Sequence, residues 1–486
     1  MSFFLGIDLG TSSIKLLLIG EDQTVIDSSS APLDVQRQHP GWSEQDPASW
    51  LTATEAAMEE LKSRHPIELS AVSGIGLSGH MHGATLLNAS GNVLRSCMLW
   101  NDTRSFAEAA ELDAQPVFRN LTGNIVFPGF TAPKVLWVAR HEPAVFADTA
   151  KVLLPKDYLR LWLTGEYVSE MSDAAGTSWL DVGKRDWDAS LLAATGLNLS
   201  HMPSLVEGTE VSGYLRKDLA ARWGMAGNVA VAGGAGDNAA SACGMGTVAP
   251  GTAFVSLGTS GVLFASNDSY RPNPSSAVHA FCHAIPNTWH QMGVILSATD
   301  SLNWLANLTG RDPASLTGDL GETLQQPGPV MFLPYLSGER TPHNDAAIRG
   351  VFTGLGHESG ADAMAKAVIE GVAFAVRDSL DALAAAGTEL TRVTAIGGGS
   401  RSLYWLNVIA TVLNIPVDVP AEGDFGAAFG AARLGLIAAT GADPLTVCAP
   451  PKTDRIIEPD ASLTQAFHDA HQRYKHLYPA IKGALN

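Results

Sequence analysis

The tetrapeptide Leu-Gly-Thr-Ser occurs twice in this chain, at residues 9–12 and at residues 257–260. Each copy lies between two apolar runs that are typical of β-strands: residues 3–7 and 15–19 for the first, and residues 253–256 and 262–265 for the second. A strand, a tight turn and a second strand form a hairpin whose tip exposes backbone N–H groups and two hydroxyls. Such a tip is suited to phosphate oxygens, because several donors can point at one anion. The repeat therefore predicts two similar domains, each presenting a phosphate-binding hairpin to a shared cleft.

The length and composition of the chain agree with two domains. At 486 residues the chain exceeds what one hydrophobic core usually organises. A hydrophobic content of 46% with 16% charged residues is typical of a globular protein that builds large cores. Strands alternate with helices in both halves, which favours α/β layers with mixed sheets. We therefore expect an α/β protein with domains over residues 1–246 and 247–486 that flank a central cleft.

Charge and cysteine usage narrow the functional classes. The formal charge of −18 argues against general nucleic-acid binding, which requires a concentrated basic surface. The cysteines at positions 97, 243, 282 and 448 show no paired spacing, so neither a disulfide framework nor a zinc site is expected. The apolar start of the chain is too short for a signal-peptide core, and no apolar run reaches the ~20 residues of a membrane span. We expect a cytoplasmic protein with no nucleic-acid or membrane partner, and a homodimer stays open.

Asp8 directly precedes the first Gly-Thr-Ser tip. From there its carboxylate could hold Mg²⁺ through water while the tip approaches the phosphates of a nucleotide. The alternative is an Asx-turn residue that stabilises its own loop. The second hairpin favours the role at the phosphates, because a paired phosphate loop needs a cation beside it in so acidic a chain.

Asp237 stands where an expected strand over residues 229–232 and a loop over residues 233–236 give way to a helix. Ligands of open α/β sheets bind outside the carboxyl ends of strands, so this carboxylate should face the cleft. The helix N-terminus favours its ionised form, as a general base requires. An ordinary helix cap is the alternative, and the surrounding glycines favour the functional role. Asn238 supplies a donor and an acceptor that suit a hydroxylated substrate.

Met81 and His82 also follow an expected strand, over residues 71–77, and have glycine on both sides at positions 79 and 83. The strand end and the two glycines support equally a His82 that faces the substrate and a His82 with a structural role. Asp102 and Arg104, further along the chain, have the spacing of a surface ion pair of little energy.

The run Gly397–Gly399 follows an expected strand over residues 392–396. Three glycines allow the backbone to pass close to a flat ligand such as adenine. The run is not a dinucleotide fingerprint, because the G-x-G-x-x-G spacing and a following acidic residue are not found together. The Walker-A sequence of the P-loop proteins is not present in the chain either.

These motifs, taken in order, resemble the FGGY family of carbohydrate kinases over essentially the whole chain. The matching segments are Ile7–Ser12, Gly41–Pro47, Met81–Gly83, Phe130–Trp137, Gly236–Ala240, Ser256–Gly261, Gly338–Pro342 and Arg349–Leu355. Within the family, residues 81–85, 154–158 and 172–177 are most similar to the members that phosphorylate D-xylulose. Two departures lie near the sugar: His80 stands where those members commonly carry Gln, and Ala235 replaces a glycine.

The resemblance implies two actin-like (ribonuclease H-like) ATPase domains and transfer of phosphate from ATP to D-xylulose, with Mg²⁺. On this basis Asp237 is the base, Asp8 acts near the metal with Asp237 as a further candidate ligand, and the sugar meets Met81, His82, Asp237 and Asn238. Thr11 and Ser12 face the transferred phosphate. The nucleotide meets Gly258 and Thr259 at its phosphates and Gly398 and Gly399 at its adenosine.

Three other functions stay open at this point. Another ketose or polyol kinase of the same family is the first. A non-enzymatic ATPase of the actin and heat-shock type is the second, and the residues around His82 and Asp237 speak against it. A dinucleotide-dependent oxidoreductase is the third, although the chain lacks its fingerprint.

Overall fold

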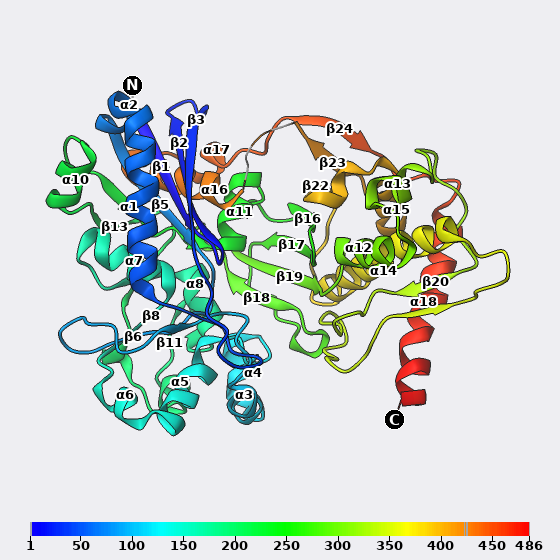
Figure 1. Cartoon of the computed structure of the whole chain (residues 1–486), viewed down its shortest axis with the longest axis horizontal. Coiled ribbons are helices and arrows are strands. Elements are labelled where there is room, and N and C mark those ends of the chain that lie inside the picture. Colours follow the sequence, from blue (N-terminus) through cyan, green and yellow to red (C-terminus); the bar gives the residue numbers. More distant parts are fainter. Residues whose placement is uncertain (1, 422, 424–425, 486) are drawn as a thin grey trace.

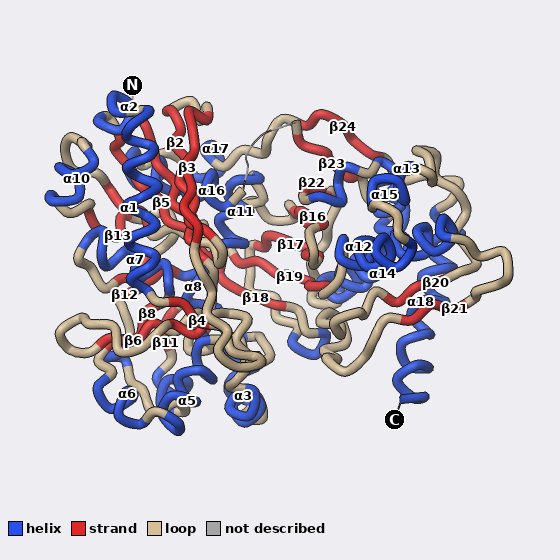
Figure 2. The backbone as a smooth tube through the Cα atoms, viewed as in Figure 1, coloured by secondary structure: helices blue, strands red, loops and turns tan. Residues whose placement is uncertain are grey.

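The computed structural model describes residues 2–421, 423 and 426–485. Two mixed sheets of seven strands each dominate it, one built by each half of the chain, with helices on their faces (Figures 1 and 2). None of the described helices is both long and apolar enough to cross a bilayer. The four cysteines lie buried as free thiols.

The N-terminal sheet has the order β13-β14-β5-β1-β2-β3, with the short strand β15 also paired to β5. Its strands are β1 (Phe3–Leu9), β2 (Ser13–Gly20), β3 (Val25–Pro32), β5 (Val72–Gly79), β13 (Val211–Tyr214), β14 (Ala230–Ala232) and β15 (Ala235–Gly236). The main helices of this half are α1 (Pro47–Arg64), α5 (Thr131–His141), α7 (Pro155–Thr164), α8 (Met171–Ala174), α10 (Lys217–Trp223) and α11 (Asp237–Met245).

The C-terminal sheet has the order β18-β19-β17-β16-β22-β23-β24. Its strands are β16 (Ala253–Leu257), β17 (Gly261–Asn267), β18 (His279–Cys282), β19 (Trp289–Ile295), β22 (Val393–Ile396), β23 (Val417–Pro420) and β24 (Thr453–Ile457). Strands β20 (Met331–Leu333) and β21 (Val351–Thr353) form a separate pair. The main helices are α12 (Thr299–Thr309), α13 (Pro313–Gly318), α14 (Ala361–Ala384), α15 (Leu403–Leu413), α16 (Ala427–Thr440) and α18 (Thr464–Leu485).

The two sheets share one pairing pattern. In the first, β1 pairs antiparallel with β2 on one side and parallel with β5 on the other, and β5 pairs parallel with β14. In the second, β16 pairs antiparallel with β17 and parallel with β22, and β22 pairs parallel with β23. This repetition confirms the expected fold of two actin-like (ribonuclease H-like) domains with mixed sheets.

The two repeated tetrapeptides form the tips of corresponding hairpins, as the sequence predicts. Leu9 pairs with Ile14 across the first hairpin, whereas Leu257 pairs with Gly261 across the second, so the first tip is one residue longer. The leucine before each tip is fully buried. Apolar burial therefore anchors each hairpin at its base, while the polar tip projects beyond the sheet.

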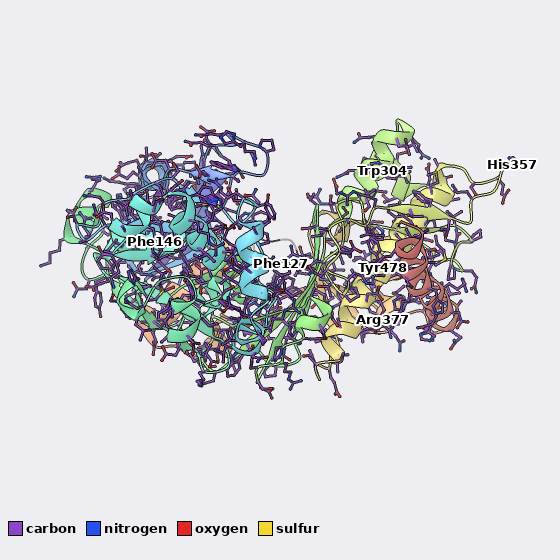
Figure 3. All side chains as sticks on the ribbon, turned by 90° about the horizontal axis from the view of Figure 1, so that it is seen from below. Phe127, Phe146, Trp304, His357, Arg377 and Tyr478 are labelled. Atoms are coloured by element: carbon purple, nitrogen blue, oxygen red, sulfur yellow. The ribbon has the colours of Figure 1, made fainter. Side chains whose placement is uncertain are left out.

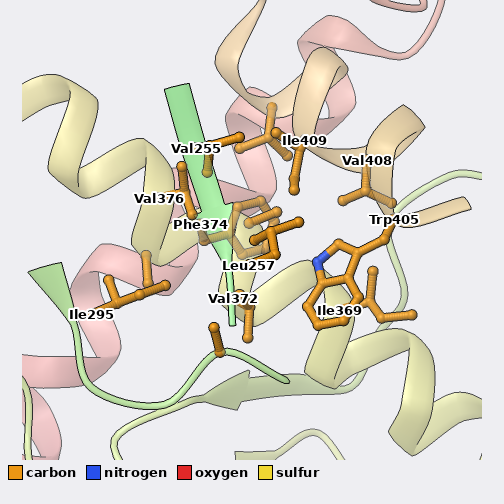
Figure 4. Packing of buried hydrophobic residues seen from close by; sticks show 14 of the residues in the cluster. Val255, Leu257, Ile295, Ile369, Val372, Phe374, Val376, Trp405, Val408 and Ile409 are labelled. Atoms are coloured by element: carbon orange, nitrogen blue, oxygen red, sulfur yellow. The ribbon is translucent and has the colours of Figure 1, made fainter. Parts of the chain in front are cut away.

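The C-terminal core lies between the sheet and helices α14 and α15 (Figure 4). Leu257, at the base of the second tip, packs there with Val372 and Trp405. Residues 367–376 of α14 are all buried, because the helix packs against the sheet on one side and against α15 and β20 on others. This packing places the second hairpin on a rigid support.

Helix α16 packs on the N-terminal sheet, although it belongs to the C-terminal half of the sequence. It contacts β5, β1 and α11 extensively and lies beside them in Figure 1. A Cβ at Gly76 of β5 would clash with the carbonyl oxygen of Ala431, so glycine in the strand permits the close approach of this alanine-rich helix. Residues 427–440 thus pack on the sheet of the N-terminal domain, although the sequence-based division places them in the domain of residues 247–486. The two domain ranges, 1–246 and 247–486, stay a prediction.

Candidate active site

Strand register brings the residues expected at the sugar to one edge of the N-terminal sheet. Asp8 of β1 and Ala235 of β15 both pair with Ser78 of β5. The three strands therefore end side by side in the same direction. Met81 follows β5 and Asp237 follows β15, as the first residue of α11. Their common position is the carboxyl edge at which open α/β sheets bind ligands.

A cavity of about 660 Å³ opens at this edge, between the two domains. All four residues expected to contact the sugar line it: Met81, His82, Asp237 and Asn238. The opposite wall comes from the C-terminal domain and includes Ser260 of the second tip, His279, Phe281 and Arg340. The cavity is large enough for a five-carbon sugar together with part of a phosphate chain.

Asp237 combines partial burial with a neighbouring negative charge. Its Oδ1 accepts hydrogen bonds from the backbone N–H of Asn238 at 2.7 Å and from the Asn238 side-chain amide at 2.9 Å. Burial, with a smaller contribution from the Asp8 carboxylate, raises the pKa of Asp237 to about 6. This pKa suits a general base near neutral pH, because the carboxylate is ionised there and more basic than an ordinary aspartate.

His82 is held in one orientation by its backbone and its ring. Its φ of 70° is left-handed, and its Nδ1 lies 2.7 Å from the carbonyl oxygen of Gly176. The ring stacks on Phe130 with centroids 4.3 Å apart. Burial lowers the pKa of His82 to about 3, so the imidazole is neutral. Because Nδ1 faces an acceptor it carries the proton, which leaves Nε2 as an acceptor for a hydroxyl group.

Close packing beneath the cavity explains why small residues surround these side chains. A Cβ at Gly176 would lie 2.6 Å from the His82 ring, and one at Gly236 would lie 2.9 Å from the Met81 side chain. Lys134 of α5 donates to the carbonyl oxygen of His82 at 2.9 Å. These contacts fix the strained loop after β5 from below.

A fully buried cluster of charges supports the start of α11. Lys156 Nζ lies 2.8 Å from Asp157, 3.5 Å from Glu170 and 3.4 Å from Asp173. Glu170 accepts hydrogen bonds from the Ser172 and Asp173 backbones. The Ser172 hydroxyl in turn accepts one, at 3.1 Å, from the backbone N–H of Gly236, the residue before Asp237. The cluster is thereby linked to the backbone that positions Asp237.

The two hairpin tips are held through their carbonyl and hydroxyl oxygens. Thr11 accepts at its carbonyl from Gln45 at 2.7 Å and at its hydroxyl from the Trp100 indole at 3.0 Å. In the second tip, the carbonyl of Gly258 accepts from the backbone N–H and hydroxyl of Thr299, where α12 begins. Ser12, Thr259 and Ser260 are exposed at the tips. Such exposed groups are available to phosphate oxygens.

The glycine run after β22 lies between two further hollows of the C-terminal domain. Gly398 and Gly399 line one of about 400 Å³ with Thr299 and Trp405. Gly397 lines the other, of about 1030 Å³, together with Ser241 of α11. Because Asp237 and Ser241 are one turn apart on α11, the first turn of this helix lies between the cavity of about 660 Å³ and the hollow of about 1030 Å³.

One sequence expectation is wrong, and three residues at the site were not singled out as functional. Asp102 and Arg104 are buried rather than a surface pair: Arg104 Nη2 lies 2.6 Å from Asp102, Nη1 lies 2.7 Å from Glu44, and the guanidinium covers Trp42. The three others are Trp100, Lys134 and Arg340. Each of these residues lies in a matched family segment or beside a strand end. Its position at the site, however, depends on contacts with residues that are distant in the sequence.

A duplicated actin-like fold, with a cavity between its two domains that is lined by the second hairpin tip, defines the class of actin-like ATPases. Family models narrow this class: the N-terminal domain model of the FGGY family of carbohydrate kinases matches residues 3–244, and its C-terminal domain model matches residues 253–439. This chain belongs to the FGGY family of carbohydrate kinases, which makes it a sugar kinase that uses ATP.

Relatives and solved structures agree with this membership. The xylulose kinase of Escherichia coli (strain K12) is 48% identical and is matched over 98% of this chain and 99% of its own. The xylulose kinase of Bacillus subtilis (strain 168) is 34% identical over 99% of this chain and 98% of its own. A crystal structure described as a xyloylose kinase from Brucella ovis is 66% identical, with a TM-score of 0.98 and complete coverage of both chains. The structure of the xylulose kinase from Rhodospirillum rubrum is 29% identical, with a TM-score of 0.92 over 99% of each chain.

Proposed function

We propose that this protein transfers the γ-phosphoryl group of ATP to D-xylulose and forms D-xylulose 5-phosphate. The observation that carries the proposal is one cavity in which Asp237 and His82 face the second hairpin tip. The xylulose kinases among the relatives, matched over nearly their full length, support this sugar as the acceptor.

In this proposal the acceptor side is built by the N-terminal domain. Asp237 takes the proton of the terminal hydroxyl of the sugar. The oxygen of that hydroxyl attacks the γ-phosphorus of ATP, and ADP leaves. Asn238 and the neutral Nε2 of His82 hydrogen-bond other sugar hydroxyls, and Met81 contacts the carbon chain. Because His82 is fixed by Gly176 and Phe130, little ordering is required when the sugar binds.

The donor side uses both hairpins and the glycine run. Thr11 and Ser12 face the transferred phosphate, Gly258 and Thr259 face the nucleotide phosphates, and adenosine lies along Gly398 and Gly399. Phosphoryl transfer has a loose transition state with its charge spread over oxygen atoms, so positioning and fixed donors provide most of the rate. Backbone N–H groups at two rigid tips supply such donors.

Asp8 and Asp237 also fit a divalent cation. Their charges are close enough for Asp8 to raise the pKa of Asp237, and carboxylate oxygens are the preferred ligands of Mg²⁺. Asp8 would hold the ion through water, with Asp237 as a further candidate ligand. When bound, the cation neutralises charge on the phosphate oxygens.

Purified protein is expected to phosphorylate D-xylulose with the highest kcat/KM of a panel that also contains D-ribulose, L-ribulose, L-xylulose and glycerol. Coupled ADP release measures each rate, and release without sugar sets the background. If another compound of this panel has a higher kcat/KM than D-xylulose, that compound and not D-xylulose is the preferred substrate. ADP release that no sugar or polyol stimulates would contradict the kinase proposal itself.

Gly398→Val is expected to raise the KM for ATP at least tenfold and to leave the KM for D-xylulose unchanged. A Cβ at residue 398 meets no atom within 4 Å, so the new side chain would occupy the hollow and not disturb the fold. Steric overlap of this size costs about 1–3 kcal/mol. Gly483→Val, at a position in α18 with equally open surroundings, is the control. An unchanged KM for ATP would show that the adenosine does not bind in this hollow.

A further inference from the structure

Arg340 reaches the sugar-side cavity from the C-terminal domain. It lies in the loop between β20 and β21, and its guanidinium is 3.9 Å from the ring centroid of Phe127 in the other domain. In Figure 3, Phe127 lies at the edge of the N-terminal domain that borders the C-terminal domain. Arg340 Nη1 lies 3.2 Å from Nε2 of His279, and all three residues line the cavity. The guanidinium therefore spans the gap between the domains where the sugar is expected.

The guanidinium has fewer protein partners than its charge requires. Throughout the described part of the chain, no carboxylate oxygen lies within 4.0 Å of its nitrogen atoms, and Nε2 of His279 is its one side-chain acceptor. The neighbouring Glu339 turns away and accepts from the backbone N–H groups of Leu296 and Arg340. Burial lowers the pKa of Arg340 to about 10, which leaves it charged at neutral pH. Because Arg340 lines the cavity, its remaining donors are available to oxygen atoms of a ligand.

The cavity has two electrically different sides. The positive charge of Arg340 contributes to the low pKa values of His82 and His279, whereas the negative charge of Asp8 raises the pKa of Asp237. Arg340 thus lies beside His279, which shares the Phe130 ring with His82, whereas Asp237 lies near the carboxylate of Asp8. A sugar with its terminal hydroxyl at Asp237 would extend its far end, which carries the ketone, toward Arg340.

We propose that Arg340 is a sugar-binding residue that donates hydrogen bonds to the ketone oxygen and the adjacent hydroxyl of the substrate. The inference rests on the proposed function, because it assumes a ketose with its terminal hydroxyl at Asp237. The planar guanidinium suits two neighbouring oxygen atoms, which it can contact at once. Since Arg340 belongs to the C-terminal domain, the bound sugar contacts both domains.

The test compares Arg340→Met with wild-type enzyme in steady-state kinetics and in D-xylulose binding by calorimetry. Methionine retains an apolar stem against Phe127 but has no donor. A hydrogen bond to a charged group contributes enough for its loss to raise the KM and the Kd for D-xylulose about 10- to 100-fold. The KM for ATP should change less than twofold and kcat less than threefold, because the contact is equally strong in the ground and transition states.

Arg349→Met is the matched control, because Arg349 lies in the same loop, is exposed, and donates to the backbone carbonyls of Ala346 and Ile348. It should leave the KM for D-xylulose within twofold of wild type. Arg340→Lys keeps the charge without the planar fork and should give an intermediate KM; it replaces the methionine variant if that protein does not fold.

A KM for D-xylulose within threefold of wild type in Arg340→Met would overturn the proposal. An equal rise in Arg349→Met, or an equal rise in the KM for ATP, would also overturn it, because the loop rather than the contact would then be responsible. If the panel shows that wild-type enzyme prefers another sugar, only the substrate proposal fails. The same variants are then compared with that sugar.

Discussion

Asp237→Asn is expected to lower kcat for sugar phosphorylation about 10³-fold and to change the Kd for ATP less than twofold. Removal of a general base typically costs 10²- to 10⁴-fold in rate. Asparagine has nearly the same shape and can still accept the hydrogen bonds from Asn238. The loss would therefore report the missing proton acceptor and not a displaced helix. ADP release measures kcat, and calorimetry measures nucleotide binding.

Asp218→Asn provides the control for a helix start, because Asp218 also lies in the first turn of a helix, α10, but on the surface. It should have wild-type kcat. If Asp237→Asn keeps wild-type turnover, another group accepts the proton, and the role given to Asp237 is wrong. If Asp237→Asn also loses ATP binding, the residue contributes to the nucleotide site.

The raised pKa of Asp237 predicts a pH dependence of two quantities, the kcat/KM of the wild-type enzyme and the stability of the fold. Wild-type kcat/KM should fall tenfold per pH unit below about pH 6, because the protonated carboxyl cannot accept the sugar proton. For stability, a folded pKa above the ordinary value means that the native state binds more protons than the unfolded state between about pH 4 and 6. The free energy of unfolding therefore contains a favourable contribution from Asp237 at pH 4, and this contribution is lost as the pH rises through about 6. At pH 7 the asparagine variant should thus be more stable than wild type, by up to about 3 kcal/mol, and the difference should shrink toward pH 4.

Local sequence patterns account for the hairpins and for the strand ends that carry the site. The apolar runs on both sides of Gly10 and Gly258 predict two antiparallel strand pairs, and both pairs form. Asp46 and the proline that follows it predict the start of α1, and the Asp46 side chain caps that helix through Ala48 N–H. Such features depend on a few neighbouring residues, so one sequence is sufficient to predict them.

Features that depend on distant contacts could not be predicted in the same way. The Ala/Gly-rich composition of α16 predicts close packing but does not say against which sheet, and Gly76 lies about 350 residues earlier in the chain. Asp102 and Arg104 have the spacing of a surface pair, and Glu44 and Trp42 bury them. Arg340 stood within a matched family segment, but its position over Phe127 depends on how the domains meet.

Lys156→Met is expected to destabilise the protein by about 3–5 kcal/mol, the usual loss when one partner of a buried ion pair is removed. Lys156 is fully buried among Asp157, Glu170 and Asp173. Burial raises the pKa of Asp173 well above its ordinary range. Arg160, whose Nη2 lies 3.6 Å from Asp157, is the other cation of this cluster. Methionine would therefore leave the buried carboxyl groups with one compensating positive charge fewer. The urea midpoint measures the loss.

The surface lysine Lys184 is the control, because it pairs with Asp181 at 2.8 Å but is 75% exposed. Lys184→Met should leave the urea midpoint unchanged, since water screens such a pair. The double variant Lys156→Met/Asp157→Asn removes one carboxylate together with the lysine, so it restores the charge balance and should recover part of the lost stability. A double variant no more stable than Lys156→Met would attribute the loss to packing and not to charge. Because the cluster is linked through Ser172 to Gly236, the single variant should also have a lower kcat than Lys184→Met, and an unchanged kcat would show that Asp237 is positioned without it.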